Sequence, residues 1–301
     1  MHNDAPQPPV LSPAGTPASG GSVHIEALTR VCVDDLLSAF GVGSLRRGRR
    51  PLELLFRFPA QRLAHQVATY DRIVGKLGLG AGGAWMLERM ARSVEVEGQK
   101  NIPRQGPLLI VANHPGLTDT VVLFAAIPRS DLCVVAAERP FLDVLPNTSQ
   151  YLLTMSETSS ERFRLLRSAT RHLRGGGAIL TFPAGRIEPD PAVLPGAIEA
   201  LGYWSPSADL FARLVPRLAI VPAVVSGVLS PAALRNPLTF LRRRPKDRQW
   251  LAATLQVMVP ALRNVTVRVA FGQPVYANAQ GATGQITLEE TQRLIERCGA
   301  G

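Results

Sequence analysis

The sequence is poor in cysteine and in lysine, and these scarcities exclude several classes of protein. Cys32, Cys133 and Cys298 are odd in number and show no C-x-x-C spacing. Such a set disfavours a disulfide framework and a cysteine-based metal site, and it favours a reducing compartment. Lysine occurs only three times, so arginine supplies nearly all of the positive charge.

Long apolar runs are also absent. No stretch reaches the about 18 uncharged apolar residues that a transmembrane helix needs. The N-terminus lacks the basic and then apolar order of a signal peptide. We therefore expect a cytoplasmic chain whose contact with a membrane, if it makes one, is peripheral and on the cytoplasmic face.

Positive charge is abundant, with a formal net charge of +10 over 301 residues. Two basic clusters stand out, at 46–50 and at 242–248. They fit an anionic membrane surface, nucleic acid, acidic substrates or a solvated surface that reflects arginine-rich codon usage. Aromatic residues are only 6 % and are not interleaved with the clusters, which argues against nucleic acid. An amphipathic stretch follows the second cluster and favours an anionic membrane.

Composition divides the chain into three parts. Residues 1–22 are rich in Pro, Gly, Ser and Ala and are predicted to be a disordered tail. Residues 23–93 form an N-terminal helical segment, and residues 94–301 form an α/β domain. Apolar periodicity within the helical segment predicts helices over 25–40, 52–77 and 84–92, separated by glycine-rich breaks.

Buried-strand patterns alternate with helical patterns after residue 93, which predicts an α/β sheet covered by helices. Continuous apolar runs such as "PLLIVA" are typical of strands that are covered on both faces. The predicted strands are 93–98, 107–112, 132–137, 178–182, 218–227 and 265–272. The predicted helices are 117–127, 160–174 and 288–297.

The motif "NHPGLTD" (113–119) directly follows the first of these buried runs. Pro115 suits the first turn of a helix, so His114 is expected at a strand-to-helix junction, where a cleft forms in α/β folds. Asp119 can orient the imidazole and raise its basicity. The alternative is that His114 caps the helix and Asp119 is a solvated first-turn acid. No G-x-S-x-G nucleophile motif occurs, so direct attack by an activated substrate hydroxyl fits better than a covalent enzyme intermediate.

Two further motifs follow at later strand ends. "FPAGRIEPD" (182–190) can present the amides of 184–186 as an anion nest, with Arg186 as a phosphate clamp. The alternative is a proline-glycine turn with a surface arginine. Pro222 lies inside the apolar run at 218–227, which predicts an edge strand or an irregularity in it.

The three motifs together resemble the glycerolipid acyltransferase superfamily. N-H-x4-D after a strand, then F-P-x-G with an arginine, then a strand with V-P occur here in that order over roughly residues 94–280. The lead-in "VEGQKNIPRQGPLLIVANHPG" and the later "VRVAFGQPV" extend the likeness. The best-known members are the 1-acyl-sn-glycerol-3-phosphate acyltransferases. The resemblance implies a mixed, largely parallel sheet of the glycerol-3-phosphate acyltransferase type.

By this resemblance, His114 is the general base and Asp119 orients it. A fatty acyl group passes from a thioester on coenzyme A or acyl carrier protein to a hydroxyl of a lysophospholipid or related glycerolipid, as in phospholipid biosynthesis. Neither a cofactor nor a metal is implied. The implied substrate-binding residues are Asn113, Phe182, Pro183, Gly185, Arg186 and Arg162.

The sequence departs from the family pattern in its later motifs. Ala184 stands where the family's F-P-E-G-T-R has a glutamate, and the arginine comes one residue early; Glu188 is a candidate substitute. In the second motif, Arg162 is the nearest candidate for the usual arginine. These departures leave open a different acceptor, or a catalytically altered relative that binds lipid or acyl carrier. The intact pair of His114 and Asp119 opposes the second alternative.

Overall fold

The protein is built around one eight-stranded sheet. The computed structural model describes residues 21–45, 47–116, 118–155, 158–277 and 282–299. Most of the predicted tail therefore lies outside the described residues, while Gly21 and Ser22 belong to the first helix. The division of the chain into three parts stays a prediction.

The strands follow the order β1-β7-β6-β2-β5-β3-β4, and β8 pairs with β6. β6 runs antiparallel to β7 and β8, whereas all other neighbours are parallel. The predicted mixed, largely parallel sheet is thus confirmed. The bounds are β1 (Ser93–Glu97), β2 (Leu108–Ala112), β3 (Leu132–Ala137), β4 (Leu152–Met155), β5 (Ala178–Thr181), β6 (Ala219–Ser226), β7 (Thr266–Phe271) and β8 (Val275–Tyr276).

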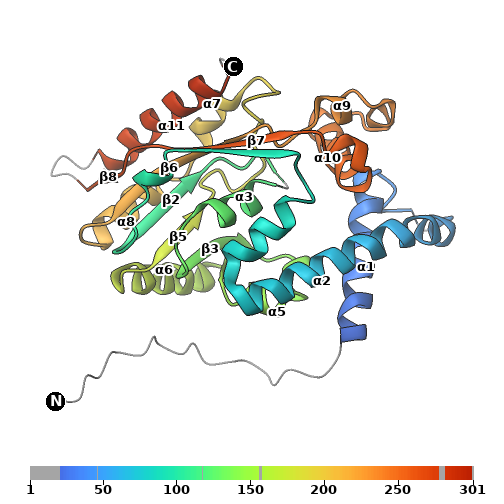
Figure 1. Cartoon of the computed structure of the whole chain (residues 1–301), viewed down its shortest axis with the longest axis horizontal. Coiled ribbons are helices and arrows are strands. Elements are labelled where there is room, and N and C mark those ends of the chain that lie inside the picture. The colour runs from blue at the N-terminus through green and yellow to red at the C-terminus, as the bar shows by residue number, and fades with distance from the viewer. Residues whose placement is uncertain (1–20, 46, 117, 156–157, 278–281, 300–301) are drawn as a thin grey trace.

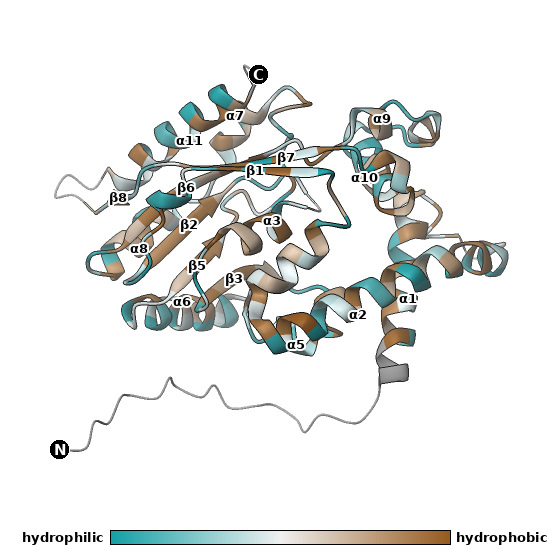
Figure 2. Ribbon diagram, viewed as in Figure 1, coloured by the Kyte–Doolittle hydropathy of each residue, from teal (hydrophilic) through white to brown (hydrophobic). Residues whose placement is uncertain are grey.

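Helices cover both faces of the sheet (Figure 1). Leu108 and Ile110 of β2 pack toward α2 and α3, and the intervening Leu109 and Val111 pack toward α6 and α8. Alternate side chains of a strand point to opposite faces, so a strand covered on both faces is apolar throughout. Figure 2 shows this pattern as brown strands beneath helices whose outer sides are teal.

The longer helices are α1 (Gly21–Ala39), α2 (Arg49–Leu87), α3 (Asp119–Ala126), α6 (Ser159–Arg174), α8 (Ser207–Leu214), α10 (Pro245–Met258) and α11 (Thr283–Gly299). The short elements are η1 (Gln99–Asn101), α4 (Pro140–Asp143), α5 (Pro146–Ser149), α7 (Ala197–Ala200), η2 (Leu201–Tyr203), α9 (Pro231–Leu234), η3 (Pro237–Leu241) and η4 (Pro260–Leu262). Among the residues the structure describes, no helix has both the length and the apolar character needed to span a bilayer.

The N-terminal helical segment differs in detail from the prediction. The expected helices at 52–77 and 84–92 are the two arms of α2, which is kinked at Gly78, where φ is 85° and ψ is 173°. The second arm begins directly after the kink and ends at Leu87. The other glycines of "GLGAGG" are helical, so the predicted break is a single residue.

Pro222 lies in β6, which is a central strand and not an edge strand. Ala219 and Val225 donate their N–H groups toward β2, so alternation turns the nitrogen of Pro222 toward β7 and β8. The partner of β6 changes there, from β8 at Ile220 to β7 at Ala223. The missing N–H therefore costs no ladder hydrogen bond. Of the two predicted alternatives, an edge strand or an irregularity, the structure shows an irregularity: the change of partner strand at Pro222.

Candidate active site

The site is built on the loop that joins β2 to α3. β2 ends at Ala112 and α3 begins at Asp119, with Thr118 as its N-cap. His114 lies at this junction, as predicted, but Pro115 lies in the loop and not in the first helical turn. The helix starts later because Asp119 uses its side chain within the loop.

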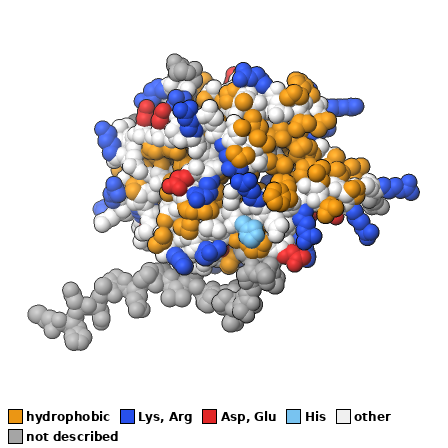
Figure 3. Space-filling model, turned by 45° about the vertical axis from the view of Figure 1, so that its right-hand side comes forward, with side chains coloured by type: hydrophobic (Ala, Val, Ile, Leu, Met, Phe, Trp, Pro, Cys, Tyr) orange, Lys and Arg blue, Asp and Glu red, His pale blue; other side chains and the backbone are white. Residues whose placement is uncertain are grey.

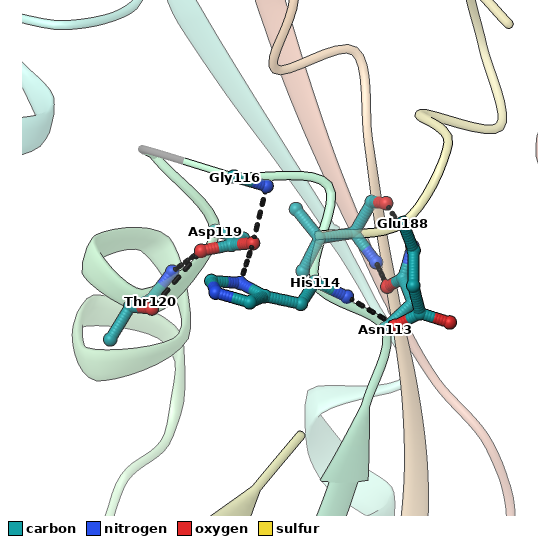
Figure 4. Close-up of polar contacts among 7 residues, drawn as sticks. Asn113, His114, Gly116, Asp119, Thr120 and Glu188 are labelled. Carbon is teal, nitrogen blue, oxygen red and sulfur yellow. Dashed lines mark hydrogen bonds and ion pairs between the residues drawn. The ribbon is translucent and has the colours of Figure 1, made fainter. Parts of the chain in front are cut away.

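His114 and Asp119 form a hydrogen-bonded pair (Figure 4). The imidazole Nδ1 lies 2.7 Å from Asp119 Oδ2. The same carboxylate oxygen accepts the Gly116 N–H at 2.7 Å, and Oδ1 accepts the hydroxyl of Thr120 at 3.0 Å. Gly116 has a φ of 107°, a conformation that favours glycine and turns its N–H toward Asp119. The loop and the first helical turn thus fix the position of the Asp119 carboxylate, and the carboxylate in turn orients the ring.

Asp119 is fully buried, with a relative exposure of 0 %. The alternative interpretation, in which it is a solvated first-turn acid, is therefore wrong. A buried carboxylate is stable only when donors satisfy its oxygens, and this one has four: the ring Nδ1 of His114 and three groups from Gly116 and Thr120. With Nδ1 bound to Asp119, the tautomer leaves the lone pair on Nε2.

The second ring nitrogen of His114 is free. Within the described part of the chain no hydrogen bond reaches Nε2, and the side chain is 28 % exposed. Phe182 stacks on the imidazole with ring centroids 4.5 Å apart. Burial alone lowers the pKa of His114, but the hydrogen bond and charge of Asp119, helped by the charge of Glu188, outweigh it and raise the pKa above its ordinary value.

Asn113 anchors the loop to the sheet. Its side chain donates to the Val225 carbonyl at 2.9 Å and accepts the Val225 N–H at 2.7 Å. Because Asn113 is buried and both amide groups are occupied by β6, the structure gives it a place in the scaffold next to His114. It does not present this side chain as a free ligand.

The motif "FPAGR" forms a turn at the end of β5. Gly185 has a φ of 62° and donates its N–H to the Phe182 carbonyl at 3.0 Å, so one amide of the expected anion nest is already occupied. Pro183 accepts the Ser205 N–H through its carbonyl. Arg186 is exposed and its guanidinium carbon lies 3.5 Å from the ring centroid of Tyr203. The turn therefore presents Arg186 on an aromatic support.

Glu188 also reaches the His114 loop. Its Oε2 accepts the His114 N–H at 2.8 Å, and its own N–H donates to the His114 carbonyl at 2.8 Å. Trp204 Nε1 donates to Oε1 at 2.8 Å. From the sequence, Glu188 is only a candidate for the missing glutamate, and no spacing points to Trp204.

Asp190 ties the same segment to β6. Its carboxylate accepts the N–H groups of Gly227 at 2.8 Å and Leu229 at 3.0 Å. The three motifs recognised in the sequence are therefore joined physically, since Glu188 binds the first, Asp190 binds the third, and both belong to the second.

Two other arginines, Arg162 and Arg139, lie in different positions relative to His114. Arg162 is exposed on α6, and within the described residues no contact joins its side chain to His114, Phe182 or Arg186. Arg139, which sequence analysis missed, follows β3, and its positive charge acts on His114. Its position two residues beyond a parallel strand is the signal that could have found it, because parallel strands end at one edge.

Titratable side chains do not gather as a metal site would need. No group of three or more His, Cys, Asp or Glu residues suited to a metal ion occurs in the part of the chain that the structure describes.

A family model described as Acyltransferase matches residues 93–225, which hold His114, Asp119 and the segment that contains Glu188. Residues 93–225 are thus similar to acyltransferase domains. The resemblance to the glycerolipid acyltransferase superfamily is thereby confirmed. No curated protein matches the chain. Among solved structures, it is similar to the 1-acyl-sn-glycerophosphate (LPA) acyltransferase PlsC from Thermotoga maritima, at 17 % identity over 93 % of this chain and 95 % of that one, with a TM-score of 0.44.

Proposed function

We propose that this acyltransferase moves a fatty acyl group from a thioester, on coenzyme A or acyl carrier protein, to a hydroxyl of a lysophospholipid or related glycerolipid. The observation that carries the proposal is the imidazole of His114, which is bound through Nδ1 to a buried carboxylate and has no partner at Nε2 among the residues the structure describes. That arrangement suits a general base.

The proposed reaction needs no group covalently attached to the enzyme. Nε2 of His114 takes the proton of the acceptor hydroxyl while its oxygen attacks the thioester carbonyl carbon. The C–O bond forms, the C–S bond of the tetrahedral intermediate breaks, and the leaving thiolate takes the proton from the imidazolium. Asp119 stabilises the imidazolium during the interval between the two proton transfers.

Two arginines support an acceptor that carries a phosphate. Arg139 follows β3 and Arg186 follows β5, and both strands run parallel to β2, so both residues lie at the strand-end edge that holds His114. Within the described residues neither forms an ion pair, and Arg186 is supported by Tyr203. Guanidinium groups bind phosphate through paired hydrogen bonds.

An acceptor panel tests this function. Wild-type protein is incubated with labelled acyl-coenzyme A or acyl-carrier protein and with lysophosphatidate, other lysophospholipids and monoacylglycerol. We expect transfer to a phosphate-bearing acceptor, and Arg186→Ala should raise the KM for that acceptor about tenfold or more while leaving transfer to monoacylglycerol unchanged. Absence of transfer to any acceptor from either donor would contradict the proposal.

We also propose that the enzyme works on an anionic membrane surface, at its cytoplasmic face. Large apolar side chains are exposed near the start of α2 and on η3, and Phe58 and Phe240 reach 76 % and 67 % exposure. The two regions lie at one end of the molecule (Figure 1), where Arg242 donates to the Ser38 carbonyl at 3.4 Å. Figure 3 shows apolar side chains gathered there with lysine and arginine along their margin.

The basic clusters contribute unequally to this surface. Arg49 pairs with Asp34 and Glu53, and Arg242 pairs with Asp247, so these two charges are compensated. Arg46 lies outside the described residues. The exposed cations of the two clusters that form no ion pair within the described residues are Arg47, Arg50, Arg243, Arg244, Lys246 and Arg248. Each cation near an anionic leaflet contributes about 1 kcal/mol.

A further inference from the structure

Glu188 is a second carboxylate beside the base, and it comes from a different loop than Asp119. Asp119 binds the ring of His114, whereas Glu188 binds its main chain on both sides of the residue, through His114 N and His114 O (Figure 4). If the Glu188 side chain served only to fix the loop, a neutral acceptor such as an amide oxygen would be sufficient, and a charged carboxylate would not be needed.

The charge of Glu188 is costly. The residue is only 4 % exposed, and within the described residues it has no lysine or arginine in an ion pair. Within the described residues, its carboxylate accepts hydrogen bonds from the N–H groups of His114 and Trp204. Burying a carboxylate without a paired cation is unfavourable, and burial raises the pKa of Glu188 despite these donors. A buried carboxylate that forms no ion pair within the described residues suggests that its negative charge has a functional role.

The negative charge of Glu188 stabilises the protonated imidazole of His114. The charged groups that act on it are Asp119, Glu188 and Arg139; the two carboxylates favour its protonated form and Arg139 opposes it. Ala184 offers no carboxylate at the position where the family motif has one. The same loop supplies one four residues later.

We propose that Glu188 is a positioning residue for the base. It fixes the main chain of His114 through two hydrogen bonds and provides a second negative charge that stabilises the imidazolium formed during acyl transfer. This inference rests on the proposed function for its catalytic part, while its electrostatic part concerns the folded protein alone.

Glu188→Gln tests the inference, with Asp190→Asn as a matched control. Both variants convert a buried carboxylate of the same loop to an amide, but Asp190 binds Gly227 and Leu229 and not His114. The titration midpoint of His114 is measured by NMR in each folded protein, and the signal is assigned among the five histidines with His114→Gln. The dependence of kcat on pH is measured in parallel.

We expect Glu188→Gln to move the His114 midpoint to lower pH, because a negative charge is removed. The acidic limb of the kcat profile should move in the same direction, and kcat on the plateau should fall about tenfold, less than the roughly hundredfold that a displaced reacting group can cost. Asp190→Asn should lower the melting temperature and leave the midpoint in place. An unchanged midpoint in Glu188→Gln, or an equal shift in Asp190→Asn, would overturn the inference.

The two proposals fail in distinguishable ways. If wild-type protein transfers no acyl group, the proposed function fails, and the NMR midpoint still decides whether Glu188 acts on His114. If Glu188→Gln does not fold, Glu188→Ala carries the test, since it removes the same negative charge. A wild-type midpoint together with a wild-type kcat in Glu188→Ala would then overturn the inference.

Discussion

His114 has two ring nitrogens in different surroundings, and this difference is what makes it suited to act as a base. Nδ1 faces a buried carboxylate whose other contacts are N–H and O–H groups, whereas Nε2 has no hydrogen bond within the described residues and belongs to a partly exposed side chain. The pair was predictable from the spacing in "NHPGLTD". What spacing alone could not decide was the burial of Asp119, which separates a catalytic pair from an ordinary helix start.

The raised pKa of His114 predicts the shape of the pH profile. In the proposed mechanism the base acts in its neutral form, so acyl transfer should be lost as pH falls through the pKa of His114. Because Asp119 and Glu188 outweigh the effect of burial, this acidic limb should lie above the value of 6.5 for an unperturbed histidine. Initial rates at saturating substrate across a pH series give the position of the limb.

Asp119→Asn provides the comparison for that profile. Removing the carboxylate should move the limb to lower pH and reduce kcat by roughly 10²–10⁴-fold, because both the orientation of the ring and the stabilisation of the imidazolium are lost. A limb for Asp119→Asn at or above the wild-type position would contradict the assigned role of Asp119.

Other residues of the site could not be predicted from spacing. Glu188 binds His114, Trp204 binds Glu188, and the charge of Arg139 acts on His114, only because separate loops converge at one edge of the sheet. Arg162 illustrates the reverse case: it was selected by its place in a motif, and the helix carries its exposed side chain without a described contact to the other candidates.

At the scale of elements, apolar runs predicted the central strands well. β2, β5 and β6 are buried at every position, and their sequences are apolar except for Thr181 and Ser226 at the ends of β5 and β6. β4 and β8 were missed because they are short and partly exposed, and their sequences carry no period-2 pattern long enough to recognise.

The glycines of α2 show why a glycine-rich stretch is difficult to interpret. Gly78 breaks the helix, but Gly83 is helical and allows α3 to approach closely. A Cβ at Gly83 would lie 2.8 Å from the Val121 carbonyl oxygen and 2.9 Å from the Phe124 Cβ. At Gly80 a Cβ would lie 3.5 Å from its nearest neighbour, an ordinary contact.

Gly83→Ala and Gly80→Ala should therefore have opposite effects on stability. Gly83→Ala should destabilise the protein by about 1–3 kcal/mol, because overpacking separates two helices. Gly80→Ala should stabilise it by about 0.5–1 kcal/mol through helix propensity. Urea unfolding measures both, and a Gly83→Ala variant as stable as Gly80→Ala would show that the α2–α3 contact is looser than described.

At the scale of the whole molecule, the exposed apolar and basic residues of the start of α2, η3 and the start of α10 share one end. These elements lie away from α6 (Figure 1). If this end binds an anionic membrane, the triple variant Arg243→Glu, Arg244→Glu, Lys246→Glu should lose flotation with anionic liposomes. The expected loss exceeds tenfold, because each cation contributes about 1 kcal/mol and the replacements are repelled. Raising the salt concentration should also reduce the flotation of the wild-type protein with anionic liposomes, because salt screens the attraction.

The matched control places the same charge change on α6. Arg164, Arg167 and Arg171 are exposed on that helix, and their replacement by glutamate should leave flotation near the wild-type level. Equal losses in the two triple variants would indicate that net charge governs binding and that no particular face does.

The most direct test of the account is the initial rate of acyl transfer by His114→Ala, with His65→Ala as control, using the best donor and acceptor of the panel. His65 is exposed on α2, so its removal should leave the rate unchanged. We predict that His114→Ala loses about 10²-fold or more of the rate while remaining folded, in keeping with the contribution of a general base. A folded His114→Ala variant that transfers acyl groups at the wild-type rate would contradict the central claim.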